Sequence, residues 1–137
     1  MQLDFKNTKM LLLDFYEIQK IEEIEKGKYH AFILLNKDHE IYKGHFPENP
    51  VLPGVCTMQI IKELTETIVQ KPLILSRAVT VKFIAMINPE LNPNLRLELN
   101  VETLDSGEVK VKNSTYFDNT LALKLSNNYK VITEWKQ

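Results

Sequence analysis

The sequence predicts an α+β fold in which one long helix lies among antiparallel strands, within a single domain of residues 1–137. Two observations carry this prediction. Apolar residues recur at three- and four-residue spacing from Val55 to about Gln70, which is typical of a helix. After Pro72 the chain changes to alternating polar and apolar residues separated by turn signals, which is typical of strands. No linker and no internal repeat divides the chain.

Two strands are expected before the helix. Residues Lys28 to Leu35 (KYHAFILL) are aromatic and aliphatic, and the turn Glu25-Lys26-Gly27 precedes them. An earlier strand is expected within Phe15 to Ile24, on the other side of that turn. The polar stretch Asn36 to Glu40 then leads into a loop rich in proline and glycine.

The helix itself is apolar on most of its circumference. Pro53 and Gly54 stand at its entry, where proline is tolerated and glycine permits close approach of the backbone. Its apolar residues form two sides, the first with Val55, Met58, Ile61 and Thr65 and the second with Ile60, Leu64 and Ile68. Such a helix is usually surrounded by other structure, so we expect a sheet wrapped around it.

Four strands are expected after the helix, and two tight turns separate the last three of them. Asp105-Ser106-Gly107 and Asp118-Asn119 have the residue types of hairpin turns. The predicted strands are Ser76–Ile87, Leu95–Leu104, Glu108–Phe117 and Leu121–Val131.

The composition limits which binding partners and which cellular compartment are expected for the protein. The net charge of −1 gives no broad positive field for nucleic acid or an anionic membrane. The single cysteine, Cys56, excludes an intramolecular disulfide and a cysteine-cluster metal site. Cys56 stands in the first helical turn, where the dipole lowers a thiol pKa, but we interpret it as a small core residue. The apolar run 10–13 is too short for a membrane span, and we expect a soluble, cytoplasmic protein.

The most distinctive stretch runs from Tyr42 to Gln59 and reads YKGHFPENPVLPGVCTMQ. Its residues Gly44-His45-Phe46-Pro47, then Pro50, then Pro53-Gly54-Val55, resemble the motif of the β-hydroxyacyl-acyl carrier protein dehydratases of the hot-dog fold. Two shorter matches, Leu12-Leu13-Asp14 and Val81-Lys82-Phe83 with Asn88-Pro89, extend the resemblance over nearly the whole chain. It implies a sheet that wraps the helix, two subunits with joined sheets, and active sites in tunnels at the dimer interface.

The resemblance also assigns roles to individual residues. The general base falls on His45, and the backbone N–H groups that polarise the thioester carbonyl fall on Gly54 and Val55. Histidine titrates near neutrality, which suits the base role. The resemblance also places Phe46, Pro53 and Phe83 against the substrate. A histidine that only packs in a rigid loop is the alternative interpretation of His45.

The sequence departs from the family pattern at two positions. Gln59 stands where the family has an acidic residue from the other subunit, and Glu48 replaces the glycine after His-Phe-Pro. An amide orients a hydroxyl or a water but does not donate a proton and regain it. Glu63, one turn beyond Gln59 on the same face, and Glu48 are the candidate substitutes. The alternative is that Lys62, Glu63 and Glu66 form a solvated stripe.

Other candidates follow from the resemblance. His30 and His39 lack metal-ligand spacing with His45, so no metal or cofactor is expected. Basic side chains are expected to dock an acidic acyl carrier protein, and the candidates are Lys43, Arg77 and Lys82. An acyl tunnel and ordinary core packing are equally good interpretations of the aromatic residues Tyr42, Phe46, Phe83, Tyr116 and Phe117.

Three functions remain open from the sequence. The first is a dehydratase of 3-hydroxyacyl thioesters on a carrier protein, active as a homodimer or a higher homo-oligomer. The second is a non-catalytic hot-dog subunit that binds acyl chains or completes a heterodimer with an active homologue. A thioesterase is the third, and the His-Phe-Pro motif disfavours it.

Overall fold

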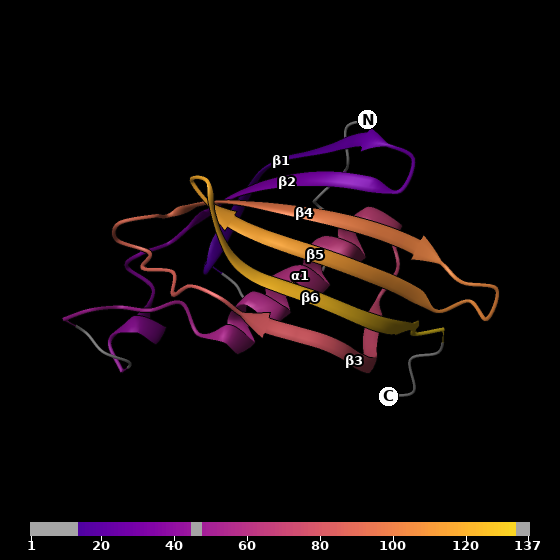
Figure 1. Cartoon of the computed structure of the whole chain (residues 1–137). Helices are drawn as coiled ribbons and strands as arrows, with labels where there is room; N and C mark the ends of the chain where they lie inside the picture. The colour runs from indigo at the N-terminus through magenta and orange to yellow at the C-terminus, as the bar shows by residue number, and fades with distance from the viewer. Residues whose placement is uncertain (1–13, 45–47, 134–137) are drawn as a thin grey trace.

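The computed structural model describes residues 14–44 and 48–133, which form one antiparallel sheet and one long helix. Figure 1 shows helix α1 (Gly54–Val69) lying along one face of the sheet. The six strands follow the spatial order β1-β2-β4-β5-β6-β3, so β1 and β3 form the two edges. The strands are β1 (Tyr16–Glu25), β2 (Lys28–Leu35), β3 (Leu73–Phe83), β4 (Asn94–Thr103), β5 (Val109–Phe117) and β6 (Thr120–Val131).

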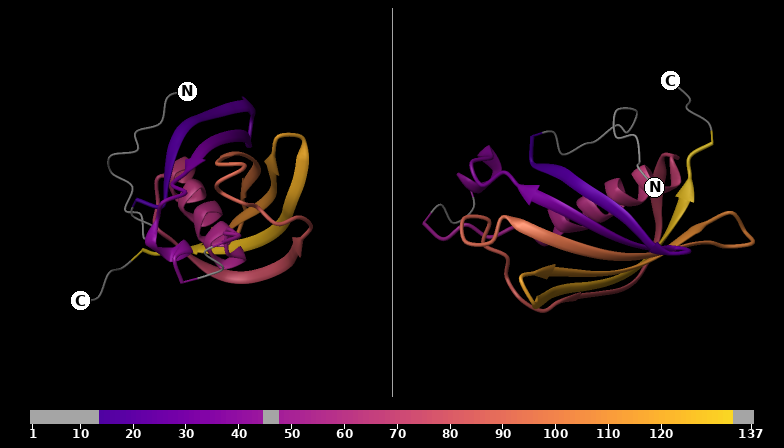
Figure 2. Two further views of the ribbon diagram at one scale, coloured as in Figure 1. Left: turned by 90° about the vertical axis from the view of Figure 1, so that its left-hand side faces the viewer. Right: turned by 90° about the horizontal axis from the view of Figure 1, so that it is seen from above.

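The sheet curls around α1, as the left view of Figure 2 shows. This arrangement buries the apolar side of the helix, where Ile60, Ile61 and Leu64 have no exposed surface. Each such side chain contributes about 1.5–3 kcal/mol to folding. The opposing strands present Ile33, Leu97 and other alternate residues to the same core. The expectation of a helix surrounded by a sheet is therefore confirmed.

Both ends of α1 have local causes. Pro53 precedes the first turn, and its carbonyl accepts hydrogen bonds from the N–H groups of Cys56 and Thr57, at 3.0 and 3.2 Å. At the other end Gln70 adopts the left-handed conformation with φ 57°, and its N–H donates to the Glu66 carbonyl. Pro72 then prevents the helix from continuing.

The strand boundaries differ from the prediction mainly around β3. This strand begins at Leu73 and ends at Phe83, so the predicted strand over Ser76–Ile87 was wrong at both ends. After Phe83 the chain leaves the ladder, because the N–H groups of Ile84 and Ala85 both donate to the Ala122 carbonyl. A short 3₁₀ helix at Glu40–Tyr42, which the sequence did not indicate, replaces part of the expected loop.

Strand β3 exposes apolar side chains at an unpaired sheet edge. Its residues 74–80 are all exposed, and the register with β6 shifts at two places, between Leu75 and Arg77 and between Ala78 and Thr80. The large exposed apolar side chains of this edge are Ile74, Leu75, Val79 and Phe83. A free edge of this kind pairs readily with another strand.

Candidate functional site

The loop that carries the dehydratase-like motif is only partly described. His45, Phe46 and Pro47 lie outside the described residues, so their predicted roles stay predictions. Glu48 is exposed and Pro50 is buried. The Leu52 N–H donates to the Ile87 carbonyl at 2.8 Å, which ties the end of the loop to the segment after β3.

The loop leads directly into the N-terminus of α1. The N–H groups of Gly54 and Val55 occupy the first two helical positions and have no carbonyl to reach within the helix. The Val55 side chain is 75% exposed, so its predicted membership of a buried helix face was wrong. No hydrogen bond from either N–H group is found among residues 14–44 and 48–133, and two such groups at the positive end of a helix dipole can stabilise an oxygen that gains negative charge.

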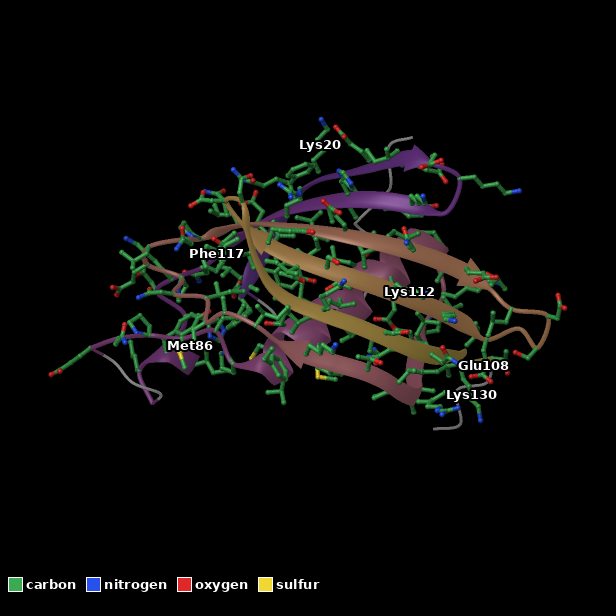
Figure 3. All side chains as sticks on the ribbon, in the orientation of Figure 1. Lys20, Met86, Glu108, Lys112, Phe117 and Lys130 are labelled. Carbon is green, nitrogen blue, oxygen red and sulfur yellow. The ribbon has the colours of Figure 1, made fainter. Side chains whose placement is uncertain are left out.

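Phe83 lies directly over this helix start. A Cβ atom added to Gly54 would come within 2.5 Å of the Phe83 ring, so glycine is needed unless the ring moves. A cavity of about 340 Å³ opens beside this contact. Its lining is mostly apolar and includes Val51, Leu52, Gly54, Phe83, Met86 and Leu123. Figure 3 labels Met86, which lies at the end of the molecule where α1 begins.

Gln59 and Glu63 meet one turn further along α1. The Gln59 Nε2 atom donates to one carboxylate oxygen of Glu63 at 2.9 Å. The Tyr16 hydroxyl, at the start of β1, donates to the other oxygen at 2.8 Å. Glu63 has no exposed surface, whereas Gln59 is half-buried. The sequence therefore placed these two helix residues correctly on one face, but the interpretation of Glu63 as part of a solvated stripe was wrong.

The Tyr16 hydroxyl is held in its neutral form. Burial, the nearby Glu63 charge and the hydrogen bond to it all raise the pKa of Tyr16 far above its usual range. A neutral hydroxyl is a donor that a buried carboxylate needs, because hydrogen bonds offset the cost of removing the charge from water. Spacing in the sequence gave no signal for this partner, since Tyr16 lies 47 positions before Glu63.

The surroundings of three other candidates, Cys56, Tyr42 and Tyr116, indicate packing roles. Cys56 is buried, as expected, and this burial raises the pKa of its thiol, so the helix dipole does not activate it. Tyr42 stacks on Phe15 with ring centroids 5.7 Å apart and belongs to the core. The Tyr116 ring lies under the Arg96 guanidinium, whose Cζ atom is 4.5 Å from the ring centroid. An ordinary packing role therefore fits Tyr116 better than tunnel lining.

Neither a metal-binding cluster nor a membrane-spanning helix is present in the part of the chain that the structure describes. Residues 14–44 and 48–133 contain no cluster of three or more His, Cys, Asp or Glu side chains able to hold a metal ion. Within the same ranges no helix is long and apolar enough to cross a membrane.

Comparison with known families identifies the class of protein. Residues 19–118, which include the helix start and all of α1, match the family described as ApeI-like, ApeI dehydratase. The chain belongs to this dehydratase family. The predicted resemblance to hydroxyacyl-acyl carrier protein dehydratases is thus confirmed at the level of the family.

The individual relatives that the chain resembles are also dehydratases. The 3-hydroxyacyl-[acyl-carrier-protein] dehydratase FabZ of Caldanaerobacter subterraneus is 26% identical over 106 residues, covering 72% of this chain and 74% of the relative. The FabZ of Clostridium novyi is 35% identical over 51 residues, or 36% of each chain. The match thus spans about a third of the length of several of these curated relatives.

Solved structures confirm the hot-dog fold. The dehydratase heterocomplex ApeI:P from Xenorhabdus doucetiae aligns with a TM-score of 0.68 and 20% identity, over 83% of this chain and 96% of that one. A hypothetical thioesterase from Streptococcus pneumoniae, solved with coenzyme A, aligns with a TM-score of 0.60 and 11% identity over 85% of each chain. At these identities the likeness is one of fold alone.

Proposed function

We propose that this member of the family is a cytoplasmic dehydratase that converts 3-hydroxyacyl thioesters on an acyl carrier protein into trans-2-enoyl thioesters. The observation that carries the proposal is the helix start, where the N–H groups of Gly54 and Val55 have no acceptor within the helix and Gly54 lines an apolar cavity. A thioester needs both features, because its carbonyl oxygen gains negative charge while its acyl chain seeks an apolar surface. The His-Phe-Pro motif precedes this helix start by a few residues.

The proposed reaction begins when His45 removes a proton from C2 of the substrate. The electron pair of that C–H bond passes through the thioester carbonyl, whose oxygen the Gly54 and Val55 N–H groups stabilise. It then forms the C2–C3 double bond as the bond from C3 to its hydroxyl breaks. The hydroxyl leaves as water and needs one proton, which a Gln59 amide does not supply. The proton that His45 has taken from C2 is then the one returned to the leaving group.

The proposal places the active unit in a dimer formed through β3. This edge is unpaired and exposes Ile74, Leu75, Val79 and Phe83, and the last of these lies on Gly54. A second β3 would extend the sheet across both subunits and cover this apolar surface. It would also close the cavity beside Gly54, which excludes water from a developing oxyanion.

Light scattering is expected to give a mass close to twice the 16.0 kDa of one chain. Replacing Val79 with lysine should shift the protein toward the monomer, because a charge would be buried at the centre of the joined edge. Lysine in place of Ile24, which is also exposed but lies on β1, is the matched control and should leave the mass unchanged. A wild-type monomer at high concentration would contradict this assembly.

Three basic residues support a carrier protein as the source of the substrate. Lys43, Arg77 and Lys82 are exposed, and among the ion pairs of residues 14–44 and 48–133 none involves them. Lys82 and Phe83 lie at the same end of β3, so an acidic carrier docked at this end of the edge strand would lie near the cavity.

A second function is favoured by one specific observation, the amide at position 59. In this alternative the chain is a non-catalytic subunit that binds acyl chains, or pairs with an active homologue whose carboxylate completes the site. The solved Xenorhabdus relative is a heterocomplex, which gives this arrangement a parallel within the fold.

The function is tested by hydration of a short trans-2-enoyl-pantetheine, followed by the loss of enoyl absorbance. The purified wild-type protein alone is expected to turn this substrate over, more slowly than an enzyme with a carboxylate at position 59. No turnover by wild type, with turnover on addition of a carboxylate-bearing homologue, would support the partner subunit instead.

A further inference from the structure

The Gln59 amide is held on one side by a buried carboxylate. A carboxyl oxygen that accepts a hydrogen bond faces the Nε2 end of a glutamine amide, because Nε2 is the only donor of that amide. The observed 2.9 Å contact from Nε2 to Glu63 has this sense. The Tyr16 hydroxyl occupies the other oxygen of the carboxylate and is a donor as well.

The orientation of the carbonyl end follows from this contact. With Nε2 directed at the buried Glu63, the Oε1 atom of Gln59 lies on the opposite side of the amide. Among residues 14–44 and 48–133, no hydrogen bond joins this oxygen to a donor of another residue. Gln59 is half-buried while Glu63 has no exposed surface, so the free oxygen belongs to the more accessible end of the pair.

We infer that Glu63 is a positioning residue that fixes the Gln59 amide with its carbonyl oxygen outward, so that Gln59 accepts a hydrogen bond from the 3-hydroxyl of the substrate. Gln59 then selects acyl thioesters with a hydroxyl at C3 over acyl thioesters without one. It holds the hydroxyl in place and leaves its protonation to another group. The role in substrate selection rests on the proposed function, whereas the orientation of the amide does not.

The orientation is tested first, in the protein without a ligand. The side-chain amide protons of Gln59 should give NMR signals displaced from those of exposed glutamines, because one proton is bonded to a carboxylate. Glu63→Gln should move these signals strongly. Glu66→Gln is the matched control, since Glu66 lies on the same helix and bonds to the Leu73 N–H instead. If Glu63→Gln and Glu66→Gln shift the Gln59 signals equally little, the positioning role is overturned.

Selection is tested by binding, in a His45→Ala background that prevents turnover. Binding of 3-hydroxybutyryl-pantetheine is expected to be about 3- to 10-fold tighter than binding of butyryl-pantetheine, which lacks the hydroxyl. Glu63→Gln should reduce this ratio to nearly one, because an amide at position 63 supports both orientations of the Gln59 amide. The affinity for butyryl-pantetheine itself should stay unchanged, which a merely structural role would not predict.

Three other results are decisive. Equal loss of affinity for both compounds would overturn the inference and assign Glu63 to stability alone. If the protein binds neither compound, the proposed function and the role of Gln59 in substrate selection are both contradicted. The NMR experiment would still test the orientation of the Gln59 amide. If Glu63→Gln does not fold, Glu63→Leu replaces it, because leucine removes the acceptor of the Gln59 amide and fills the same buried space with an apolar side chain. A folded Glu63→Leu protein with wild-type amide signals and selection would then overturn the inference.

Discussion

Replacement of His45 by alanine is expected to lower kcat/KM for hydration of a short trans-2-enoyl thioester by about 10²–10⁴-fold. The proposed reaction uses this imidazole twice, because Gln59 cannot exchange protons. The loss should therefore lie at the upper end of the range for a single acid or base. The measurement is the initial rate of loss of enoyl absorbance, at equal concentrations of folded protein.

His30→Ala is the matched control for this variant. His30 is half-buried on β2, and its Nε2 lies 3.9 Å from a Glu98 carboxylate oxygen, far in the chain from the motif. It should retain wild-type rates. Turnover that survives His45→Ala would remove His45 from the mechanism and with it the assignment of the loop.

The exchange of Gln59 and Glu63 is expected to have the second large effect, in the opposite direction. The double variant Gln59→Glu/Glu63→Gln should raise the hydration rate by about 10²–10⁴-fold over wild type. The carboxylate at position 59 would activate the attacking water. The amide introduced at position 63 would donate a hydrogen bond to this carboxylate. The present pair shows that the two side chains reach one another, because the Gln59 Nε2 and Glu63 Oε2 atoms are 2.9 Å apart.

Gln59→Glu alone should gain much less. It would place two carboxylates at hydrogen-bond distance, and two like charges this close cannot both ionise without a large cost. The pair should keep a proton, so that one carboxyl pKa is raised above its unfolded value. The single variant should then lose stability as the pH rises above about 4.3, the ordinary pKa of glutamate, because the unfolded chain then releases both protons while the folded chain still holds one.

The pH dependence of thermal unfolding separates these two variants. The melting temperature of Gln59→Glu should fall below that of the double variant as the pH rises toward neutrality. Equal rates and equal stability of the two variants would mean that position 63 does not influence position 59. Inactivity of both, with an active wild type, would show that the site does not use a carboxylate there.

Much of the fold was accessible from local patterns in the sequence. The strand Lys28–Leu35 has the predicted bounds, and the helix differs from its prediction by one residue at each end. These elements have strong periodicity and clear turn residues. The bounds of β3 were wrong because its residues 74–80 are exposed on a sheet edge, where the alternation of buried and exposed positions that marks other strands is absent.

The site was accessible only in part. The i, i+4 spacing placed Gln59 and Glu63 on one face, and the family resemblance singled out Gly54 and Phe83, which the structure brings into contact. The burial of Glu63 was not accessible, since a carboxylate among helix residues normally faces water. Its burial depends on a tyrosine from the first strand, and only the folded chain brings that hydroxyl to the helix.

The bare edge of β3 has a consequence for how the protein is made and handled. If a second chain normally covers it, the free monomer carries four large apolar side chains beside unpaired backbone groups. The resistance of the protein to heat and denaturant would then rise with its own concentration, because association favours the folded state by mass action. A newly synthesised chain would be most exposed to misassembly in the interval before it meets its first partner.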